Sequence, residues 1–192
     1  MEVQLLKEEL ERRLPQKRYE HVLRVAATAK KLARHYDVDE IRVELAALFH
    51  DIAKFMEPAE MRTLIEKHGE DVRLLTFHHE LWHAAAGRII AEKTFNVSDE
   101  DVLNAIRYHT TGRAGMSPIE KIVYVADLIE PGRAFPGIEQ LRTLEGKSLD
   151  RVMRDCVSHS IKYLLDNHVA VFPDSLECYN EHVQKTQLRK ES

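Results

Sequence analysis

Histidine is the over-represented residue type in this chain, with 11 among 192 residues. Several histidines stand in apolar or small-residue settings on segments with helical periodicity, as do two aspartates. In chain order these residues are His21, His50, Asp51, His83, His109 and Asp127. An ionised carboxylate on an inward helix face is costly unless it is paired or binds a metal. Helical bundles build metal sites from ligands on several facing helices. A hydrogen-bonded core histidine explains any one of these positions, but the six together predict a metal site.

The segment His79-Glu80-Leu81-Trp82-His83 suggests a different metal chemistry. It matches HExxH, in which two histidines one helical turn apart hold zinc and the glutamate activates a water molecule. No HxxGxxH extension follows it, and nothing selects a third ligand over alternatives such as Glu92. The zinc-protease interpretation is therefore the weaker one, and His78 and His79 are left as candidates for a supporting or substrate role.

Cations near the six residues would suit a phosphate-bearing substrate. Arg18 precedes His21 by about one helical turn, and Lys54 follows His50 by the same spacing. Arg133 follows Asp127 in a glycine-containing turn, and Arg113 lies just past His109. A solvated surface charge is the alternative for each. Proximity to an expected metal ligand favours a phosphate-binding role most for Lys54 and Arg133, and next for Arg18.

Apolar residues recur at spacings of three and four almost throughout, which predicts helices. The expected helices lie at about 3–14, 17–36, 41–52, 58–67, 78–93, 98–109, 117–130, 149–166 and from 174 onward. Asp39, Ser117 and Asp174 are expected helix caps, and Gly69 suits a left-handed helix end. No alternating strand pattern and no repeat occurs in the sequence. We predict one all-α domain over residues 1–192, with a core at about 15–180 and a polar C-terminal tail.

Composition excludes several classes of protein. A net charge of −4 argues against non-specific nucleic-acid or membrane-surface binding, which need a basic excess. Two cysteines without a CxxC motif are too few for a disulfide framework. The N-terminal residues lack a signal-peptide pattern, and no apolar run approaches the roughly 20 residues that span a bilayer. We therefore expect a cytoplasmic protein.

The order of the six residues is that of the HD-domain metal-dependent phosphohydrolases, which the chain resembles. The segments that carry a closer resemblance are Arg18–His21, His50–Lys54, Tyr108–Gly112, Met116–Pro118 and Tyr124–Arg133. They are similar to those of the bacterial symmetrical diadenosine tetraphosphate hydrolases of the YqeK type. The resemblance covers about residues 15–180, and 119–137 is its most specific stretch.

This resemblance implies a single HD-type helical bundle with a di-metal centre in its core. His21, His50, Asp51 and Asp127 would hold one metal, and Asp51 would bridge to a second metal completed by His83 and His109. Iron is the usual metal, and mixed imidazole and carboxylate ligands also suit manganese or zinc. The residues expected to act in catalysis are Asp51, Lys54 and Arg133. Those expected to contact the substrate are Arg18, Lys54, His83, His109, Thr110, Asp127, Arg133, Ala170, Val171, Phe172, Pro173, Asp174 and Ser175. For residues 170–175, an equally good interpretation is a connection between two helices, with Asp174 as a helix cap.

The activity implied by the resemblance is cleavage of diadenosine tetraphosphate at its centre into two ADP, by in-line attack of a metal-activated water on phosphorus. One alternative is an HD phosphohydrolase acting on another nucleotide, such as a nucleotidase or a cyclic-nucleotide phosphodiesterase. A nucleotide-sensing module without turnover is a third interpretation, which the complete ligand set disfavours. A homodimer is expected only because dimers are the commonest soluble assembly.

Overall fold

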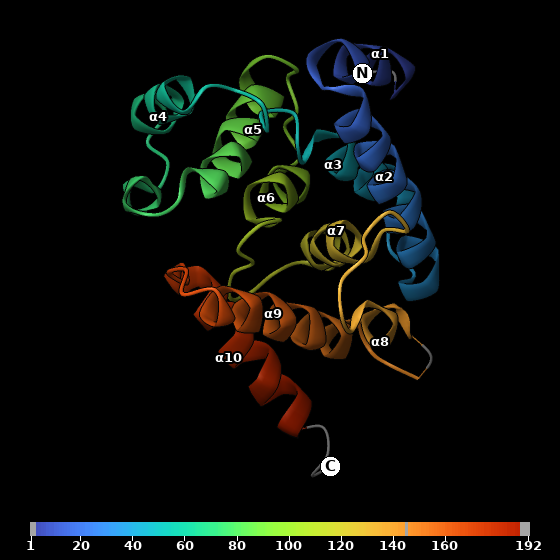
Figure 1. Cartoon of the computed structure of the whole chain (residues 1–192). Helices are drawn as coiled ribbons and strands as arrows, with labels where there is room; N and C mark the ends of the chain where they lie inside the picture. Colours follow the sequence, from blue (N-terminus) through green and yellow to red (C-terminus); the bar gives the residue numbers. More distant parts are fainter. Residues whose placement is uncertain (1–2, 145, 189–192) are drawn as a thin grey trace.

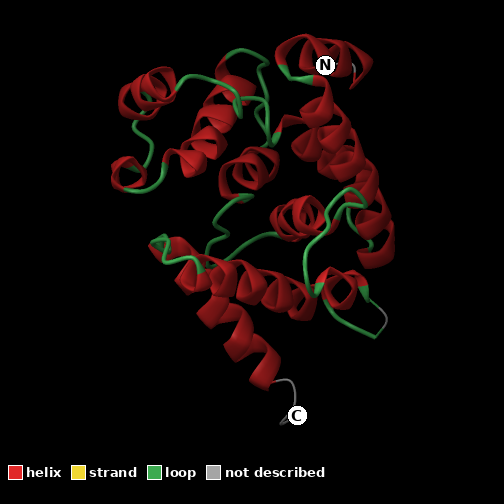
Figure 2. Ribbon diagram, viewed as in Figure 1, coloured by secondary structure: helices red, strands yellow, loops and turns green. Residues whose placement is uncertain are grey.

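The computed structural model describes residues 3–144 and 146–188, and within these ranges the chain forms helices and no strands (Figure 2). This confirms the all-α prediction. The α-helices are α1 (Val3–Arg13), α2 (Gln16–Tyr36), α3 (Glu40–Phe49), α4 (Pro58–Lys67), α5 (Trp82–Lys93), α6 (Glu100–Tyr108), α7 (Pro118–Ile129), α8 (Ile138–Arg142), α9 (Leu149–Asp166) and α10 (Pro173–Leu188). Short 3₁₀ segments lie at Val72–Thr76 and His79–Leu81. Residues 189–192 of the predicted polar tail lie outside the described residues.

Helix caps explain where two of these helices begin. The carboxylate of Asp39 accepts hydrogen bonds from the backbone N–H groups of Ile41 and Arg42. Ser117, a predicted cap, forms a capping box with Glu120, in which each side chain accepts a hydrogen bond from the other residue's backbone N–H. Both caps satisfy N–H groups that a helix start leaves without an intrahelical partner.

The observed helices differ from the predicted ones mainly at their ends. α3 ends at Phe49 rather than near Ile52, because the next backbone bond tightens to a three-residue spacing, from the N–H of Ile52 to the carbonyl of Phe49 at 3.0 Å. α5 begins at Trp82 rather than at about residue 78, and a 3₁₀ turn precedes it. α10 begins at Pro173, so Asp174 lies in its first turn and not at the expected cap position. The five-residue α8 was not expected, since it is too short to show a period.

α7 lies at the centre of the arrangement and contacts α2, α3, α6 and α9 (Figure 1). Its side chains are buried around the whole circumference, with Ile122, Val123, Val125 and Ala126 fully inaccessible. A helix that is apolar on every side belongs in the interior of a bundle. Asp127 is therefore held among the surrounding helices rather than on the surface.

The remaining helices cover this centre. α2 packs against α3 and α7, α5 packs against α6, and α9 packs against α7. α4 lies outside α5, and α10 lies outside α9 (Figure 1). Among the described residues, no helix combines the length and the apolar character needed to cross a bilayer.

Candidate metal centre

The six residues singled out in the sequence converge at one place in the core. His21 comes from α2, His83 from α5 and Asp127 from α7. His50 and Asp51 lie in the turn after α3, and His109 directly follows α6; all but Asp127 are at least 95% buried. The five helices concerned are α2, α3, α5, α6 and α7, and they pack against one another. Five segments that are distant in sequence thus bring their imidazole and carboxylate groups together, as predicted.

Asp51 lies between two pairs of histidines. Its Oδ2 atom is 3.3 Å from Nε2 of His50 and 3.7 Å from Nε2 of His21. Its Oδ1 atom is 3.1 Å from Nε2 of His83 and 3.9 Å from Nε2 of His109. Each carboxylate oxygen therefore faces one pair, which is the geometry of a carboxylate that can serve two adjacent ions.

Three of the histidines are oriented by the same local contact, in which Nδ1 donates to the backbone carbonyl three residues earlier. The donor and acceptor pairs are His50 with Ala47 at 2.6 Å, His83 with Glu80 at 2.6 Å, and His109 with Ile106 at 2.8 Å. A carbonyl can only accept, so the proton of the neutral imidazole lies on Nδ1 and the lone pair lies on Nε2. All three lone pairs are directed into the cluster, ready to bind a cation.

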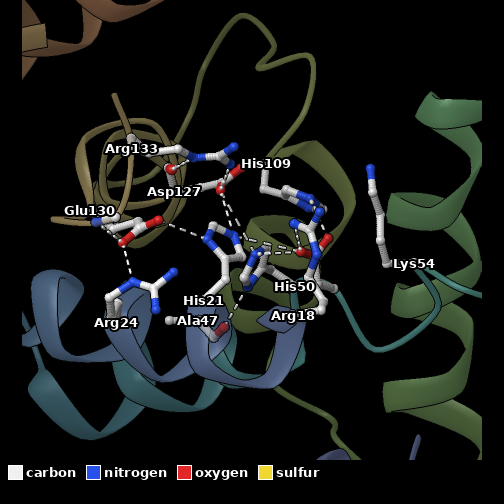
Figure 3. A network of polar contacts seen from close by, with 12 residues as sticks. Arg18, His21, Arg24, Ala47, His50, Lys54, His109, Asp127, Glu130 and Arg133 are labelled. Atoms are coloured by element: carbon white, nitrogen blue, oxygen red, sulfur yellow. Dashed lines mark hydrogen bonds and ion pairs between the residues drawn. The ribbon is translucent and has the colours of Figure 1, made fainter. Parts of the chain in front are cut away.

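His21 is oriented by a carboxylate instead of a carbonyl. Its Nδ1 lies 3.1 Å from Oε1 of Glu130, which follows α7. The other oxygen of Glu130 accepts from Nε of Arg24 and from the backbone N–H of Gly132, both at 2.6 Å. A methyl group on Gly132 would lie only 2.6 Å from Nε of Arg24, so an alanine there would displace the guanidinium from this position. Figure 3 shows His21 joined through Glu130 to Arg24.

Unsatisfied nitrogen atoms show that the cluster fits a metal. Nε2 of His21 and Nε2 of His50 are buried and form no hydrogen bond. Nε2 of His83 and Nε2 of His109 are only 3.0 Å apart, although both Nδ1 atoms already donate to carbonyls. Two lone pairs facing each other at this distance repel unless a cation lies between them. Buried nitrogens without a hydrogen-bond partner are rare in folded proteins, and metal coordination accounts for those of His21 and His50.

The donor atoms form two overlapping groups. One group contains His21, His50 and Asp127, and the other contains His50, Asp51 and His109; within each group the atoms lie within 4.8 Å of one another. No ligand among them is a thiolate, because Cys156 and Cys178 are buried elsewhere as free thiols. The centre can therefore hold divalent metal, and its nitrogen and oxygen ligands suit the harder first-row metals.

Electrostatics keeps the two carboxylates charged. Burial favours the neutral acid, but neighbouring imidazoles outweigh burial and place the pKa of Asp51 well below its usual range. The pKa of Asp127 is also lowered, because His21, His50 and Arg133 together outweigh burial. Both aspartates are thus in the ionised form that metals bind.

The pKa values of His109 and His50 are shifted in opposite directions. Burial lowers the pKa of His109 to about 3, with His50 and His83 acting in the same direction, so His109 is neutral. Burial also acts to lower the pKa of His50, yet the negative charge of Asp51 raises it above its usual value. A metal binds the neutral imidazole, so the raised pKa of His50 makes metal binding at this residue weaker as the pH falls.

The three predicted cations surround the cluster, as Figure 3 shows. Nη1 of Arg18 is 2.9 Å from Oδ2 of Asp51, and Nη2 of Arg133 is 2.6 Å from Oδ1 of Asp127. Lys54 extends beside α5, where its ammonium pairs with Glu80. Arg113, the weakest candidate, instead forms a two-pronged ion pair with the buried Glu120.

The residues predicted to contact the nucleotide lie in different settings. The hydroxyl of Thr110 is buried beside His109 and has no hydrogen-bond partner, which leaves it available to a ligand. Phe172, in contrast, is 1% exposed, and its ring packs against Phe77 with centroids 5.0 Å apart. The carboxylate of Asp174 pairs with Arg73 at 3.2 Å. Contact of residues 170–175 with a nucleoside stays a prediction, and the Phe172 ring is already packed.

The HExxH segment does not form a zinc-protease helix. His79 lies in the 3₁₀ turn before α5, and its side chain is 49% exposed. Its ring stacks on His78 with centroids 4.5 Å apart, whereas His83 turns into the cluster. The two histidines therefore do not share one helical face, and the protease alternative has no structural basis.

Two residues of the site were not assigned a role from the sequence, namely Glu130 and Arg24. Glu130 follows Asp127 by three residues, directly after the end of the apolar helix α7, and is 1% exposed. A buried carboxylate needs a partner, and this holds for Glu130 as it does for Asp127. Its partner could not be read from local spacing, because His21 and Arg24 lie on α2.

Comparison with known proteins places this arrangement in a class. The family profile of the HD domain matches residues 18–132, a range that contains all six residues of the cluster. The chain belongs to the HD domain family.

Individual relatives narrow the similarity further. The "Bis(5'-nucleosyl)-tetraphosphatase, symmetrical" of Bacillus subtilis (strain 168) is 40% identical over 171 residues, which are 89% of this chain and 92% of the relative. The protein of the same name from Halalkalibacterium halodurans is 43% identical over 168 residues, 88% of this chain and 90% of the relative. The crystal structure of a predicted HD superfamily hydrolase involved in NAD metabolism from Clostridium acetobutylicum superposes with a TM-score of 0.89 at 35% identity, covering 96% of this chain and 98% of that one. These similarities confirm the resemblance inferred from the sequence.

Proposed function

We propose that this protein hydrolyses dinucleoside tetraphosphates at the centre of the phosphate chain, which converts diadenosine tetraphosphate into two ADP. The proposal is supported by membership of the HD family and by the activity that the names of its Bacillus and Halalkalibacterium relatives state. The observation that carries it is the position of Asp51, with histidine nitrogens 3.1 to 3.9 Å from its two oxygens. A carboxylate shared in this way suits the two-metal sites that cleave phosphoanhydride bonds.

We assign His21, His50, Asp51 and Asp127 to one metal, and Asp51, His83 and His109 to a second. When bound, the metals supply Lewis acidity, which lowers the pKa of water and offsets negative charge on the phosphoryl group. Iron is the metal we expect, and manganese and zinc also match the nitrogen and oxygen donors.

The surrounding cations bind and orient the phosphate chain in this proposal. Arg18 and Arg133 each use part of their guanidinium on a carboxylate of the cluster, at 2.9 and 2.6 Å. A guanidinium has five N–H donors, so both keep donors for phosphate oxygens. Lys54 adds an ammonium on another side. Preorganised positive charge of this kind stabilises the negative charge that develops on the departing nucleoside diphosphate.

The test begins with metal analysis of anaerobically purified protein, followed by a panel of nucleotides with identification of products. Two metals per chain and ADP as the initial nucleotide product from diadenosine tetraphosphate are expected. Preferential hydrolysis of a nucleoside monophosphate or a cyclic nucleotide would favour the other phosphohydrolase activities. Tight nucleotide binding without turnover by the metal-loaded protein would favour the sensing module.

Several further predictions belong to the same proposal. They are a substrate-binding role for Thr110 and residues 170–175, a cytoplasmic location, a homodimer without nucleic-acid or membrane partners, and one domain over the whole chain. Size-exclusion chromatography with light scattering tests the dimer, and limited proteolysis followed by mass determination tests the single domain.

A further inference from the structure

A small recess borders the candidate metal centre on its His83 side. It has a volume of about 110 Å³ and is lined by Lys54, Phe55, Met56, Pro58, Met61, His79, Glu80 and His83. The His83 ring belongs to both sites, because its Nε2 atom lies 3.1 Å from Oδ1 of Asp51. A ligand that extends from the metal centre past His83 would therefore enter this recess.

The walls of the recess combine apolar and aromatic surfaces. Phe55 is 56% exposed, whereas Met61 beside it is 3% exposed and forms part of the hydrophobic core. The half-exposed ring of His79 is held by stacking on His78 and stands 6.4 Å from Trp82 in an edge contact. One exposed aromatic side chain does not by itself indicate a binding site. Here it adjoins a convergent set of polar groups at a reactive centre, which is how ligand sites are built.

The polar groups of the recess include an ion pair. Nζ of Lys54 is 2.5 Å from Oε2 of Glu80, and this pair connects the turn after α3 with the 3₁₀ turn before α5. The backbone N–H of Lys54 also donates to the carbonyl of Asp51 at 2.9 Å, so this residue joins the wall of the recess to the metal centre. A phosphate chain that extends from the centre into the recess would find this cation in the wall, adjacent in sequence to Phe55.

Lys54 and Arg133 lie on opposite sides of the histidine cluster in Figure 3. Arg133 contacts Asp127, which belongs to the His21 side, whereas Lys54 borders the His83 side. A dinucleoside tetraphosphate cut at its centre has two equal arms, which extend from the metals in two directions. Each arm ends in a purine, so the substrate needs a binding surface at both ends.

We propose that the recess formed by Phe55, His79 and His83 binds the base of the second nucleoside of a dinucleoside polyphosphate. This inference rests on the proposed function and names the part of the site that recognises the distal arm. At about 110 Å³ the recess is far smaller than the roughly 300–1,000 Å³ of pockets that enclose a whole drug-sized ligand. It fits one ring system of a longer molecule, held by stacking on an aromatic side chain.

The test compares two substrates that differ only in the second nucleoside, diadenosine tetraphosphate and adenosine 5′-tetraphosphate. With metal-loaded Phe55→Ala, we expect kcat/KM for diadenosine tetraphosphate to fall about tenfold, the scale of one lost base-stacking contact. The loss for adenosine 5′-tetraphosphate should be several times smaller, since that molecule has no distal base. Phe55→Tyr keeps the ring and should restore the preference for the dinucleotide.

The control is Tyr163→Ala, which removes an aromatic side chain that is 62% exposed. Tyr163 lies in α9 and does not line the recess. This variant should leave kcat/KM unchanged for both substrates. If Phe55→Ala lowered kcat/KM equally for both substrates, or for neither, the distal subsite would be overturned and the proposed hydrolysis would still stand. Absence of diadenosine tetraphosphate turnover in the metal-loaded wild type would instead contradict the proposed function and, with it, the basis of the subsite.

Discussion

Glu130 lies with Oε1 3.1 Å from Nδ1 of His21, although 109 residues separate the two in the chain. The carboxylate is almost fully buried, and Arg24 and the N–H of Gly132 hold its other oxygen. Although burial favours the neutral acid, these donors keep the pKa of Glu130 below its ordinary value. A buried anion at Nδ1 fixes the orientation of His21 and makes its Nε2 a stronger metal ligand.

We therefore expect Glu130→Gln to weaken metal binding by about 10- to 100-fold, the usual effect of removing such an outer partner. The amide cannot accept on both sides, so it places an N–H₂ group against either His21 or the donors from Arg24 and Gly132. Competition with a chelator would measure the affinity. Glu66→Gln, on the exposed face of α4, is the control and should leave the affinity unchanged.

Asp51→Asn should remove most bound metal and lower turnover by at least about 10³-fold, comparable to the loss of a transition-state stabiliser. An asparagine has only one acceptor atom, so it cannot face both histidine pairs as the carboxylate does. Metal analysis and kcat would be measured together, with the exposed Asp166→Asn as the control. Full metal content with unchanged activity in Asp51→Asn would rule out the di-metal assignment.

The parts of this structure that the sequence predicted are those with a local cause. Helical periodicity and the capping box of Ser117 and Glu120 located α7, and the inward position of Asp127 followed from its apolar neighbours. The pairing of Glu130 with His21 has no local cause, because it arises only when α2 packs on α7. The position at which α3 ends, just before His50, depends on a tightened turn that hydrophobic periodicity cannot resolve.

Arg42 and Asp99 connect α3 and α6, the two helices that directly precede His50 and His109. Asp99 caps α6 by accepting from the N–H groups of Asp101 and Val102, and it pairs with Arg42 at 2.6 and 2.7 Å. The hydrogen bonds from Arg42 lower the pKa of Asp99 although burial opposes this. The pair therefore stabilises the fold above the unfolded pKa of about 3.9, and its contribution is lost as the pH falls through the lower folded value.

Asp99→Asn keeps the cap and removes the charge, so it should lower the free energy of unfolding at pH 7 by less than about 1 kcal/mol. Asp99→Ala also removes the cap and should cost about 1 kcal/mol more, at every pH. Urea unfolding at several pH values would measure both. The difference between wild type and Asp99→Asn should shrink below about pH 4, and a difference that persists at pH 2 would contradict the ion-pair explanation.

Arg133 contacts a carboxylate of the cluster without being a metal-binding residue, and this separates its role from that of Asp51. Arg133→Ala should leave the metal content unchanged and lower kcat/KM about 10- to 100-fold, the scale of one charge-assisted hydrogen bond to phosphate. Arg151→Ala, exposed on α9, is the control and should leave kcat/KM unchanged. Loss of metal in Arg133→Ala would mean that its pairing with Asp127 is needed for the centre itself.

The position of the cut follows from the cations on both sides of the cluster. Lys54 stands on the His83 side and Arg133 on the Asp127 side, so phosphates can extend from the metals in two directions (Figure 3). We expect ADP as the only initial nucleotide product from diadenosine tetraphosphate. In oxygen-18 water, each turnover should place one labelled oxygen on the β-phosphate of one of the two ADP molecules, because water attacks a single phosphorus. Mass spectrometry of the early products would measure this, and initial formation of ATP and AMP would show that the substrate is held one phosphate away from the expected register.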